Sequence, residues 1–354
     1  MAPQRVAVVG AGIGGLAVAL ALAAKDLSCT VFERSAAPAA DGFGIQLPPN
    51  ATRVLYGLGL GPALDAVSVR PVAREIRRWS DGALLGRVPL GAAVTDRYGA
   101  PYLALRRADL ISVLHAAVGP GVVRFGARCT AATPDGTLTF DGAPAHTADL
   151  VVGADGLRSV VRRTVRAYLS VLDEPRPIGY AAYRAVLPAA GAPPVVTVWL
   201  GPDRHAVAYP VPGGLNLVAV TAGPLEGAFD GWDGELCKLL DAAGPAVRHP
   251  LYTRRVLPSW YRGRLAVLGD AAHPMPPFLA QGAAQAIEDA AALAASGPQD
   301  LPRYEGERRE RTARVAAASI AGGADYHLPD GAEQRRRDRR IAASGLPDQD
   351  WLFA

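Results

Sequence analysis

The chain has 354 residues, which is enough for one large domain or for two fused domains that each bury a core. Half of the residues are apolar and 20% are charged, close to the average of soluble globular proteins. A net charge of +4 is too small to indicate a nucleic-acid partner, and the one dense basic run, residues 335–340, is typical of a solvated helix face. We therefore expect no nucleic-acid binding.

The cysteines and histidines form no recognisable disulfide or metal pattern. Cys29, Cys129 and Cys237 are far apart and odd in number, and the six histidines lack the close spacing of a helical metal site. We expect no bound metal, and a reducing cytoplasm is the simplest compartment. Residues 16–24 are continuously apolar, but a strand precedes them and Lys25 follows, so we expect neither a signal peptide nor a membrane partner.

The chain opens with a strand, a glycine turn, a helix and a second strand, a βαβ unit over residues 6–32. The patterns that follow predict, in chain order, a Gly- and Pro-rich loop over 36–50, a helix over 51–58, antiparallel strands within 72–90, a helix over 108–118, short strands within 122–152, strands over 180–186, 195–200, 205–211 and 215–221, a strand over 265–268, a helix over 281–295, and helices with charged faces within 303–340.

These elements predict an α/β protein in which a mostly antiparallel β-sheet domain is inserted into a discontinuous, Rossmann-like domain. The sequence contains no internal repeat and no long linker. The predicted division assigns residues 1–70, 100–178 and 255–300 to the dinucleotide-binding domain, 71–99 and 179–254 to the substrate-binding sheet domain, and 301–354 to C-terminal helices.

Residues 10–15 form a Gly-x-Gly-x-x-Gly fingerprint between the first strand and the first helix. Gly10 and Gly12 permit a tight turn and a close approach of the backbone to a pyrophosphate, while Gly15 lets the helix pack on the strand. Glu33, at the end of the second strand, is placed to accept hydrogen bonds from an adenosine ribose. The fingerprint indicates a dinucleotide but does not distinguish NAD from FAD.

Two later segments point to a flavin. Each is a strand that runs into a glycine and an acid, the first ending at Asp155 and the second at Gly269-Asp270. An acid at a strand end beside a helix start suits a polyol, such as the ribityl chain of a flavin. The segment Gln281-Gly282-Ala283 opens a long helix, and its backbone amides would stabilise negative charge at the N1/O2 edge of the flavin ring.

Together these motifs resemble those of the flavoprotein aromatic hydroxylases, the class of para-hydroxybenzoate hydroxylase. The chain looks most similar to the branch that contains salicylate hydroxylase and 3-hydroxybenzoate 6-hydroxylase. The similarity spans nearly the whole chain, because further matching segments lie at residues 44–47, 49–51, 107–110, 273–290, 326–331 and 350–352.

The resemblance implies tightly bound FAD, with NADH or NADPH as a transient co-substrate that has no Rossmann domain of its own. Asp155 and its neighbours would serve both the FAD pyrophosphate and the nicotinamide. The residues that the resemblance assigns to FAD are Gly10, Gly12, Ile13, Gly14, Gly15, Glu33, Arg34, Arg107, Asp155, Gly269, Asp270, Gln281, Gly282 and Ala283.

The resemblance also implies a monooxygenase. Reduced nicotinamide would deliver hydride to FAD, O2 would add at the flavin C4a, and the hydroperoxide would hydroxylate a small hydroxybenzoate- or salicylate-like substrate. Activation of a phenol needs a base whose pKa lies near the working pH, and His205 matches the substrate-facing histidine of this branch. A structural histidine at a strand edge is the alternative for His205.

Other site residues also follow from the resemblance. Pro277 matches the proline near the flavin ring, and Pro276 stands where leucine is usual, which would reshape the substrate pocket. The expected substrate-binding residues are Gln46, Tyr183, Arg184, Pro276 and Phe278.

Other functions remain open at this point, because cofactor motifs do not encode the substrate. The substrate could be a larger phenolic intermediate of natural-product biosynthesis, or the enzyme could be an NAD(P)H oxidase or flavin reductase that does not hydroxylate. A non-catalytic FAD-binding protein is a further alternative. The chain looks shorter than most members of the class, within residues 224–250 and 293–303, and it leaves open whether the protein is a monomer or a homodimer.

Overall fold

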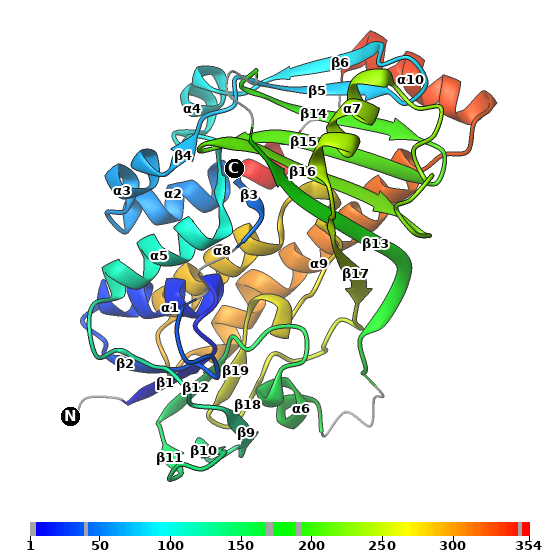
Figure 1. Cartoon of the computed structure of the whole chain (residues 1–354). Helices are drawn as coiled ribbons and strands as arrows, with labels where there is room; N and C mark the ends of the chain where they lie inside the picture. Colours follow the sequence, from blue (N-terminus) through cyan, green and yellow to red (C-terminus); the bar gives the residue numbers. More distant parts are fainter. Residues whose placement is uncertain (1–4, 39–41, 168–172, 189–192, 346–348) are drawn as a thin grey trace.

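The computed structural model describes residues 5–38, 42–167, 173–188, 193–345 and 349–354. Two large sheets lie on opposite sides of a helical layer, in which α8 (Gly282–Ser296) and α9 (Leu301–Tyr326) run side by side (Figure 1). The predicted α/β class is therefore confirmed.

The first large sheet is built around the N-terminal strand, which pairs in parallel with a strand on each side. Only its edge pair, β18 with β19, is antiparallel. Its strands, in spatial order, are β18 (Tyr261–Arg262), β19 (Leu265–Val267), β12 (Leu150–Gly153), β1 (Val6–Val9), β2 (Cys29–Phe32) and β8 (Val123–Arg124).

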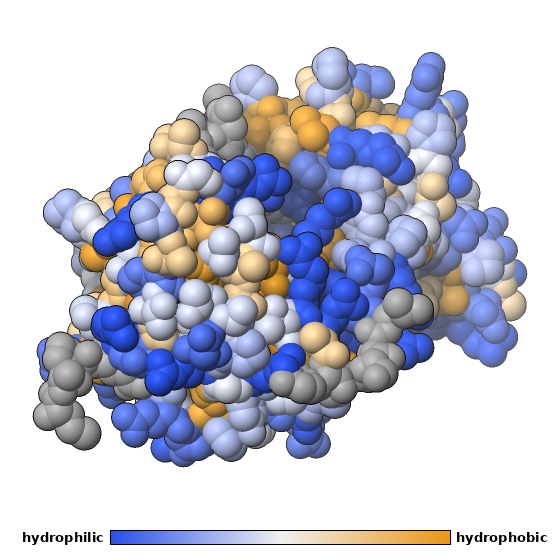
Figure 2. Space-filling model, turned by 90° about the horizontal axis from the view of Figure 1, so that it is seen from below, coloured by the Kyte–Doolittle hydropathy of each residue, from blue (hydrophilic) through white to orange (hydrophobic). Residues whose placement is uncertain are grey.

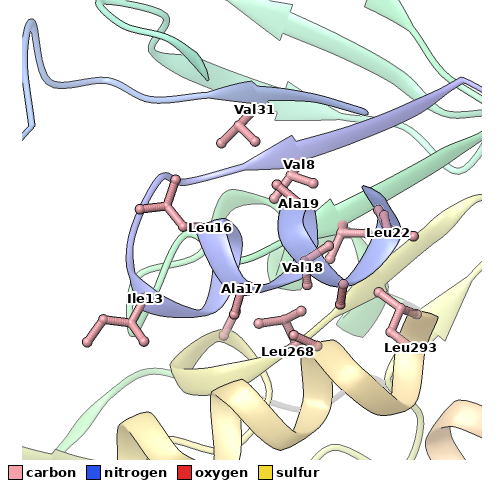
Figure 3. Packing of buried hydrophobic residues seen from close by; sticks show 14 of the residues in the cluster. Val8, Ile13, Leu16, Ala17, Val18, Ala19, Leu22, Val31, Leu268 and Leu293 are labelled. Carbon is pink, nitrogen blue, oxygen red and sulfur yellow. The ribbon is translucent and has the colours of Figure 1, made fainter. Parts of the chain in front are cut away.

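Helix α1 (Ile13–Ala23) is apolar on all sides because it is enclosed on all sides. Ten of its eleven residues are buried. Figure 3 shows Leu16 and Ala19 directed toward Val8 and Val31 of the sheet, while Ala17 and Val18 face Leu268 and Leu293 on the side of α8. This packing holds the N-terminus of α1 next to the end of β1, and the glycine fingerprint lies in the turn between them.

The second large sheet has seven strands and is antiparallel except where β14 pairs in parallel with β5. The predicted mostly antiparallel sheet is thus present, and it includes two strands within residues 72–90, where antiparallel strands were expected. Its strands, in spatial order, are β17 (Val247–Thr253), β13 (Arg176–Leu187), β16 (Gly214–Thr221), β15 (Arg204–Val211), β14 (Val195–Gly201), β5 (Ala73–Arg78) and β6 (Leu84–Pro89).

The two faces of this sheet bury different clusters, because side chains alternate along each strand. One face carries Trp199 and Leu217 and is covered by α7 (Gly234–Ala243). The other carries Tyr209 and Val198 and packs toward α9 and the first sheet. We call this second face the inner face.

Shorter elements connect the two sheets. One three-stranded sheet consists of β3 (Gly44–Leu47), β7 (Leu103–Arg106) and β4 (Ser68–Val69), and another of β9 (Cys129–Ala132), β10 (Thr137–Phe140) and β11 (His146–Thr147). The remaining helices are α2 (Pro49–Gly57), α3 (Gly61–Ala66), α4 (Ala92–Tyr98), α5 (Arg107–Val118), α6 (Val160–Arg166), α10 (Ala332–Ser344), α11 (Asp350–Phe353), and the 3-10 turns η1 (Gly269–Ala271) and η2 (Pro277–Leu279).

The basic run on α10 is only partly the solvated face that its charge predicts. Arg337 is buried, and its guanidinium donates to the carbonyl oxygens of Asp325 and Tyr326 at 2.8 and 3.1 Å, and to Asp338. These bonds satisfy backbone acceptors at the C-terminal end of α9. Part of the run therefore holds α9 in place.

The outer surface is mostly hydrophilic on the side seen in Figure 2, where apolar residues lie scattered between charged and polar ones. In the described part of the chain, none of the helices combines the length and the hydropathy needed to cross a bilayer. The same residues contain no group of three or more His, Cys, Asp or Glu side chains placed to hold a metal ion.

Candidate active site

The turn between β1 and α1 is shaped by its glycines. Gly10 has a φ of +102°, and a Cβ at Gly15 would lie 1.9 Å from the carbonyl oxygen of Gly10, so neither position accepts a larger residue. A Cβ at Gly12, in contrast, would meet no described atom within 4 Å. Helix α1 has no side-chain cap, so the amides of Ile13 and Gly14 remain available beside this open space.

Glu33 lies directly after β2 and next to this turn. Its two carboxylate oxygens accept hydrogen bonds from the backbone N–H groups of Ala11 and Ser35, each at 2.8 Å. Glu33 therefore fixes the glycine turn, and a carboxylate still has acceptor sites left for a ligand hydroxyl. Arg34 is exposed next to it.

Asp155 follows β12 and caps α6. Its Oδ2 accepts from the backbone N–H of Val160 at 2.6 Å, while Ser159 accepts from Arg162 N–H. Burial raises the pKa of Asp155, although these hydrogen bonds oppose the shift. The other oxygen, Oδ1, is buried and has no partner, which leaves it available to a ligand donor.

Arg107, at the start of α5, and Asp270, in η1, lie close enough for their opposite charges to interact. Both side chains are exposed. Burial raises the pKa of Asp270, whereas the charges of His273 and Arg107 lower it. Burial also lowers the pKa of Arg107, and the nearby charge of Arg184 acts in the same direction.

A buried carboxylate that the sequence did not identify holds the Gly269-Asp270 turn. Asp289 of α8 accepts from Gly269 N–H at 2.9 Å, and it also bonds His273 and Arg308. Burial raises the pKa of Asp289, but the charges of His273 and Arg308 outweigh it and hold this pKa at about 2. Asp289 lies within residues 273–290, which match the family pattern, but the sequence alone suggested no role for it.

The start of α8 lies beside this network. The Gln281 side chain accepts from Asn50 at 3.1 Å and from Gln285 at 3.0 Å, while Gln281 Nε2 and Asn50 Oδ1 are buried without partners. A Cβ at Gly282 would meet no described atom within 4 Å, and α8 has no side-chain cap. The amides of Gly282 and Ala283 are therefore available to a ligand.

The turn η2 lies between the Gly269-Asp270 turn and α8 in the chain, and it contacts the large antiparallel sheet. Pro277 opens it, and the carbonyl oxygen of Pro276 accepts from Ser319 of α9 at 2.7 Å. Phe278 packs on α9, where a Cβ at Gly323 would lie 2.4 Å from its ring. The ring of Phe278 reaches the inner face and meets His205 edge-on, with centroids 5.4 Å apart.

His205 lies on β15, on the inner face, and is almost completely buried. Its Nδ1 forms a hydrogen bond of 2.7 Å with Nε2 of His327, at the end of α9, and the two rings stack. Burial is the main reason that the pKa of His205 falls well below its usual value and that of His327 falls to about 4. Both rings are therefore neutral near pH 7. Sequence reasoning had matched the segment of His327 but gave it no role.

The predicted pair Tyr183 and Arg184 is split by the alternation of β13. Tyr183 points to the α7 side, where its hydroxyl donates to the carbonyl oxygen of Gly223 at 3.1 Å. Arg184 lies on the inner face, close enough to Arg107 and Tyr209 to interact electrostatically. The position of Tyr183 argues against substrate contact, and we remove it from the candidate site.

Gln46 lies on β3, in the small sheet that contacts the inner face of the large one. It accepts a hydrogen bond of 2.8 Å from the hydroxyl of Tyr102, which the sequence had not indicated. The neighbouring Gly44 donates its N–H to Asn216 of the inner face at 2.6 Å. This bond joins the small sheet to the large one, so Gln46 is held at a fixed distance from the inner face.

These features fit FAD. Uncapped helix starts at α1 and α8 suit a pyrophosphate and a reduced flavin ring, and open space lies at both glycines where the backbone would approach them. The accessible Asp270 and the unpartnered Oδ1 of Asp155 supply acceptors for hydroxyl groups.

Comparisons with known proteins agree with this geometry. Residues 4–175 and 246–319 match the family described as "FAD binding domain". The chain is 42% identical over 383 residues to 3-amino-4-hydroxybenzoate 2-monooxygenase PtnB3 of Streptomyces platensis, covering 99% of this chain and 95% of that protein. It is 35% identical over 349 residues to 6-hydroxynicotinate 3-monooxygenase of Bordetella bronchiseptica, covering 89% and 90%.

Among solved structures, a salicylate hydroxylase in complex with its substrate superposes with a TM-score of 0.81 at 25% identity, covering 99% of this chain and 95% of that one. The resemblance read from the motifs is thus confirmed. The chain belongs to the FAD binding domain family, and it is an FAD-dependent aromatic hydroxylase that uses NADH or NADPH as its reductant.

Proposed function

We propose that this enzyme hydroxylates a small benzoate that carries a hydroxyl or amino substituent, with O2 as the oxygen donor. The support is the 42% identity, over 99% of the chain, to an enzyme named for 3-amino-4-hydroxybenzoate. Apolar side chains of the inner face, together with the ring of Phe278 beside His205, suit contact with an aromatic ring. We also propose a cytoplasmic monomer or homodimer.

FAD, once bound, accepts hydride from the nicotinamide and supplies the activated oxygen. In this proposal the amides at the start of α1 and the side chain of Glu33 bind its adenosine diphosphate part. Arg107 and Asp270 bind its central section, and the amides at the start of α8 bind the flavin ring. Asp289 keeps the Gly269-Asp270 turn in place.

The observation that carries the proposed chemistry is the His205–His327 pair. We assign the proton between the rings to Nδ1 of His205, so that its Nε2 remains an acceptor. Among the described residues, no hydrogen bond to this Nε2 is formed. A phenol proton moves to this atom, and His327 stabilises the resulting charge by accepting from Nδ1. Burial keeps His205 neutral beforehand.

The remaining substrate contacts are also proposals. Gln46, held by Tyr102, and Phe278, held by α9, form two walls of the substrate space. Pro277 shapes the turn beside the flavin, and Pro276, where the class usually has leucine, changes the shape of the substrate pocket. Arg184 contributes a positive charge on the side of Arg107.

The test compares His205→Ala, His205→Gln and the wild type with 3-amino-4-hydroxybenzoate. We expect the substrate to accelerate flavin reduction by NADH or NADPH in all three enzymes. The rate of hydroxylation should fall by roughly 10²- to 10⁴-fold in both variants, so that less hydroxylated product forms per nicotinamide consumed. His115→Gln, on the outer side of α5 against Phe125, is the matched control and should behave as the wild type.

Intact coupled hydroxylation in His205→Ala would refute the assigned base. Flavin reduction that no benzoate accelerates in the wild type would refute the substrate class and direct the search to larger phenolic compounds. Nicotinamide oxidation that yields only peroxide with every phenol tested would indicate an oxidase.

A further inference from the structure

The most deeply buried arginines among the described residues are paired with carboxylates. Within the described residues, each of the four most deeply buried guanidinium groups lies next to an acid: Arg162 and Arg254 next to Asp173, Arg308 next to Asp289, and Arg337 next to Asp338. An unpaired buried charge destabilises a fold by several kcal/mol, roughly, which explains the pairing. Arg74 does not follow this rule.

Arg74 projects from β5 on the inner face, and its partners are all neutral. It donates to the hydroxyl of Tyr102 at 3.1 Å and to the Gln349 side chain at 3.5 Å, and its guanidinium lies 5.8 Å from the centre of the Tyr102 ring. Protein atoms surround it, yet part of its side chain remains accessible. Among the described residues, no carboxylate is paired with this cation.

Tyr326 connects the surroundings of Arg74 with those of His205. The ring of Tyr326 contacts His205, with centroids 5.5 Å apart, and its hydroxyl lies close enough to Arg74 for the two to interact electrostatically. Tyr102 also links Arg74 to Gln46 through two consecutive hydrogen bonds. Arg74 and the proposed base thus lie on the same face of the sheet, and Tyr326 is a neighbour of both.

We propose that Arg74 binds the carboxylate of the aromatic acid and thereby places the phenolic end of the ring at His205. A guanidinium binds a carboxylate through two parallel hydrogen bonds, which fixes the orientation of the ring as well as its position. The neutral partners of Arg74 leave its charge uncompensated until the acid enters. This inference rests on the proposed function, because it assumes a benzoate substrate.

Arg184 is the competing cation, but it is placed differently. It lies on β13, and three strands separate β13 from β5 in the sheet. Its electrostatic neighbours include Arg107, which also interacts with Asp270, and Tyr209. A carboxylate held by Arg184 would therefore lie toward Arg107, a residue that we propose for cofactor binding.

The experiment measures binding of 3-amino-4-hydroxybenzoate and of its neutral primary amide to the holoenzyme, by the change in flavin absorbance. Wild type should prefer the acid over the amide by roughly 10- to 100-fold, the value of a charged hydrogen-bonded pair. Arg74→Met should lose most of this preference by weakening the acid alone, and Arg74→Lys should keep part of it. The melting temperature of ligand-free Arg74→Met should not fall, because the substitution removes an unpaired buried charge.

Arg87→Met is the matched control, since Arg87 lies on the neighbouring strand β6, half-exposed, and pairs with Glu75. It should keep the full preference for the acid. Full preference in Arg74→Met would overturn the inference, as would loss of the preference in Arg184→Met with Arg74→Met unaffected. If the wild type binds neither compound, the proposed substrate class fails together with the inference.

Discussion

Substitution of two glycines in one turn should separate cofactor binding from stability. Gly12 and Gly15 lie three residues apart, but an added methyl group meets open space at Gly12 and the carbonyl oxygen of Gly10, at 1.9 Å, at Gly15. Gly12 also has a φ of −76°, which alanine adopts without strain. We therefore expect Gly12→Ala to impair FAD binding alone and Gly15→Ala to destabilise the fold.

The magnitudes follow from this geometry. At Gly12, alanine lowers the entropy of the unfolded chain by about 0.4–1 kcal/mol and loses a similar amount as a poorer N-cap, so the stability of the apoprotein should hardly change. A methyl group at the place of a closely approaching pyrophosphate should weaken FAD by roughly 5- to 150-fold, because overpacking costs about 1–3 kcal/mol. At Gly15 the clash is with backbone, and destabilisation should reach about 3 kcal/mol or more.

The assay is titration of each apoprotein with FAD, followed by flavin fluorescence, together with urea denaturation of the apoprotein. Gly57→Ala is the control, because Gly57 ends α2 and an added methyl group there also meets nothing within 4 Å. It should leave both FAD affinity and stability near the wild-type values. Wild-type FAD affinity in Gly12→Ala, or wild-type stability in Gly15→Ala, would refute the reasoning.

Two further predictions concern buried charge. Asp289→Asn leaves Arg308 without one of its two carboxylates, so it should destabilise the protein by roughly 3 kcal/mol and weaken the binding of FAD. Glu307→Gln, which removes one exposed ion pair, is the control and should change neither stability nor FAD binding. Equal melting temperatures for the two variants would contradict this prediction. His205 and His327 have pKa values below those of the unfolded chain, so they stabilise the fold fully above about pH 6.5, and this stability is lost as the pH falls toward 4. The free energy of unfolding should fall in that window by up to about 1.4 kcal/mol per pH unit for each histidine that titrates. His327→Gln should make this dependence of the unfolding free energy on pH less steep. An unchanged dependence in the variant would contradict the assignment of the pH effect to these two histidines.

The sequence alone determined the parts of the site that depend on local spacing. The fingerprint 10–15 lies where predicted, between a strand and a helix, because turn, dipole and close packing all depend on residues near one another in the chain. The helix expected over 281–295 begins and ends one residue later, at 282 and 296. Three ordered motifs at wide intervals were sufficient to predict the flavin family, since each carries its own local geometry.

The tertiary structure decided which side chains meet. Alternation along a strand predicts that Tyr183 and Arg184 point to opposite faces, but only the packing of α7 on one face showed which of them reaches the substrate space. His205 and His327 are 122 positions apart and come together because α9 ends against the inner face. The neutral surroundings of Arg74 come from Tyr102, Tyr326 and Gln349, which are distant from β5 in the chain. Such contacts depend on register and packing across the whole fold, for which a single sequence carries no local signal.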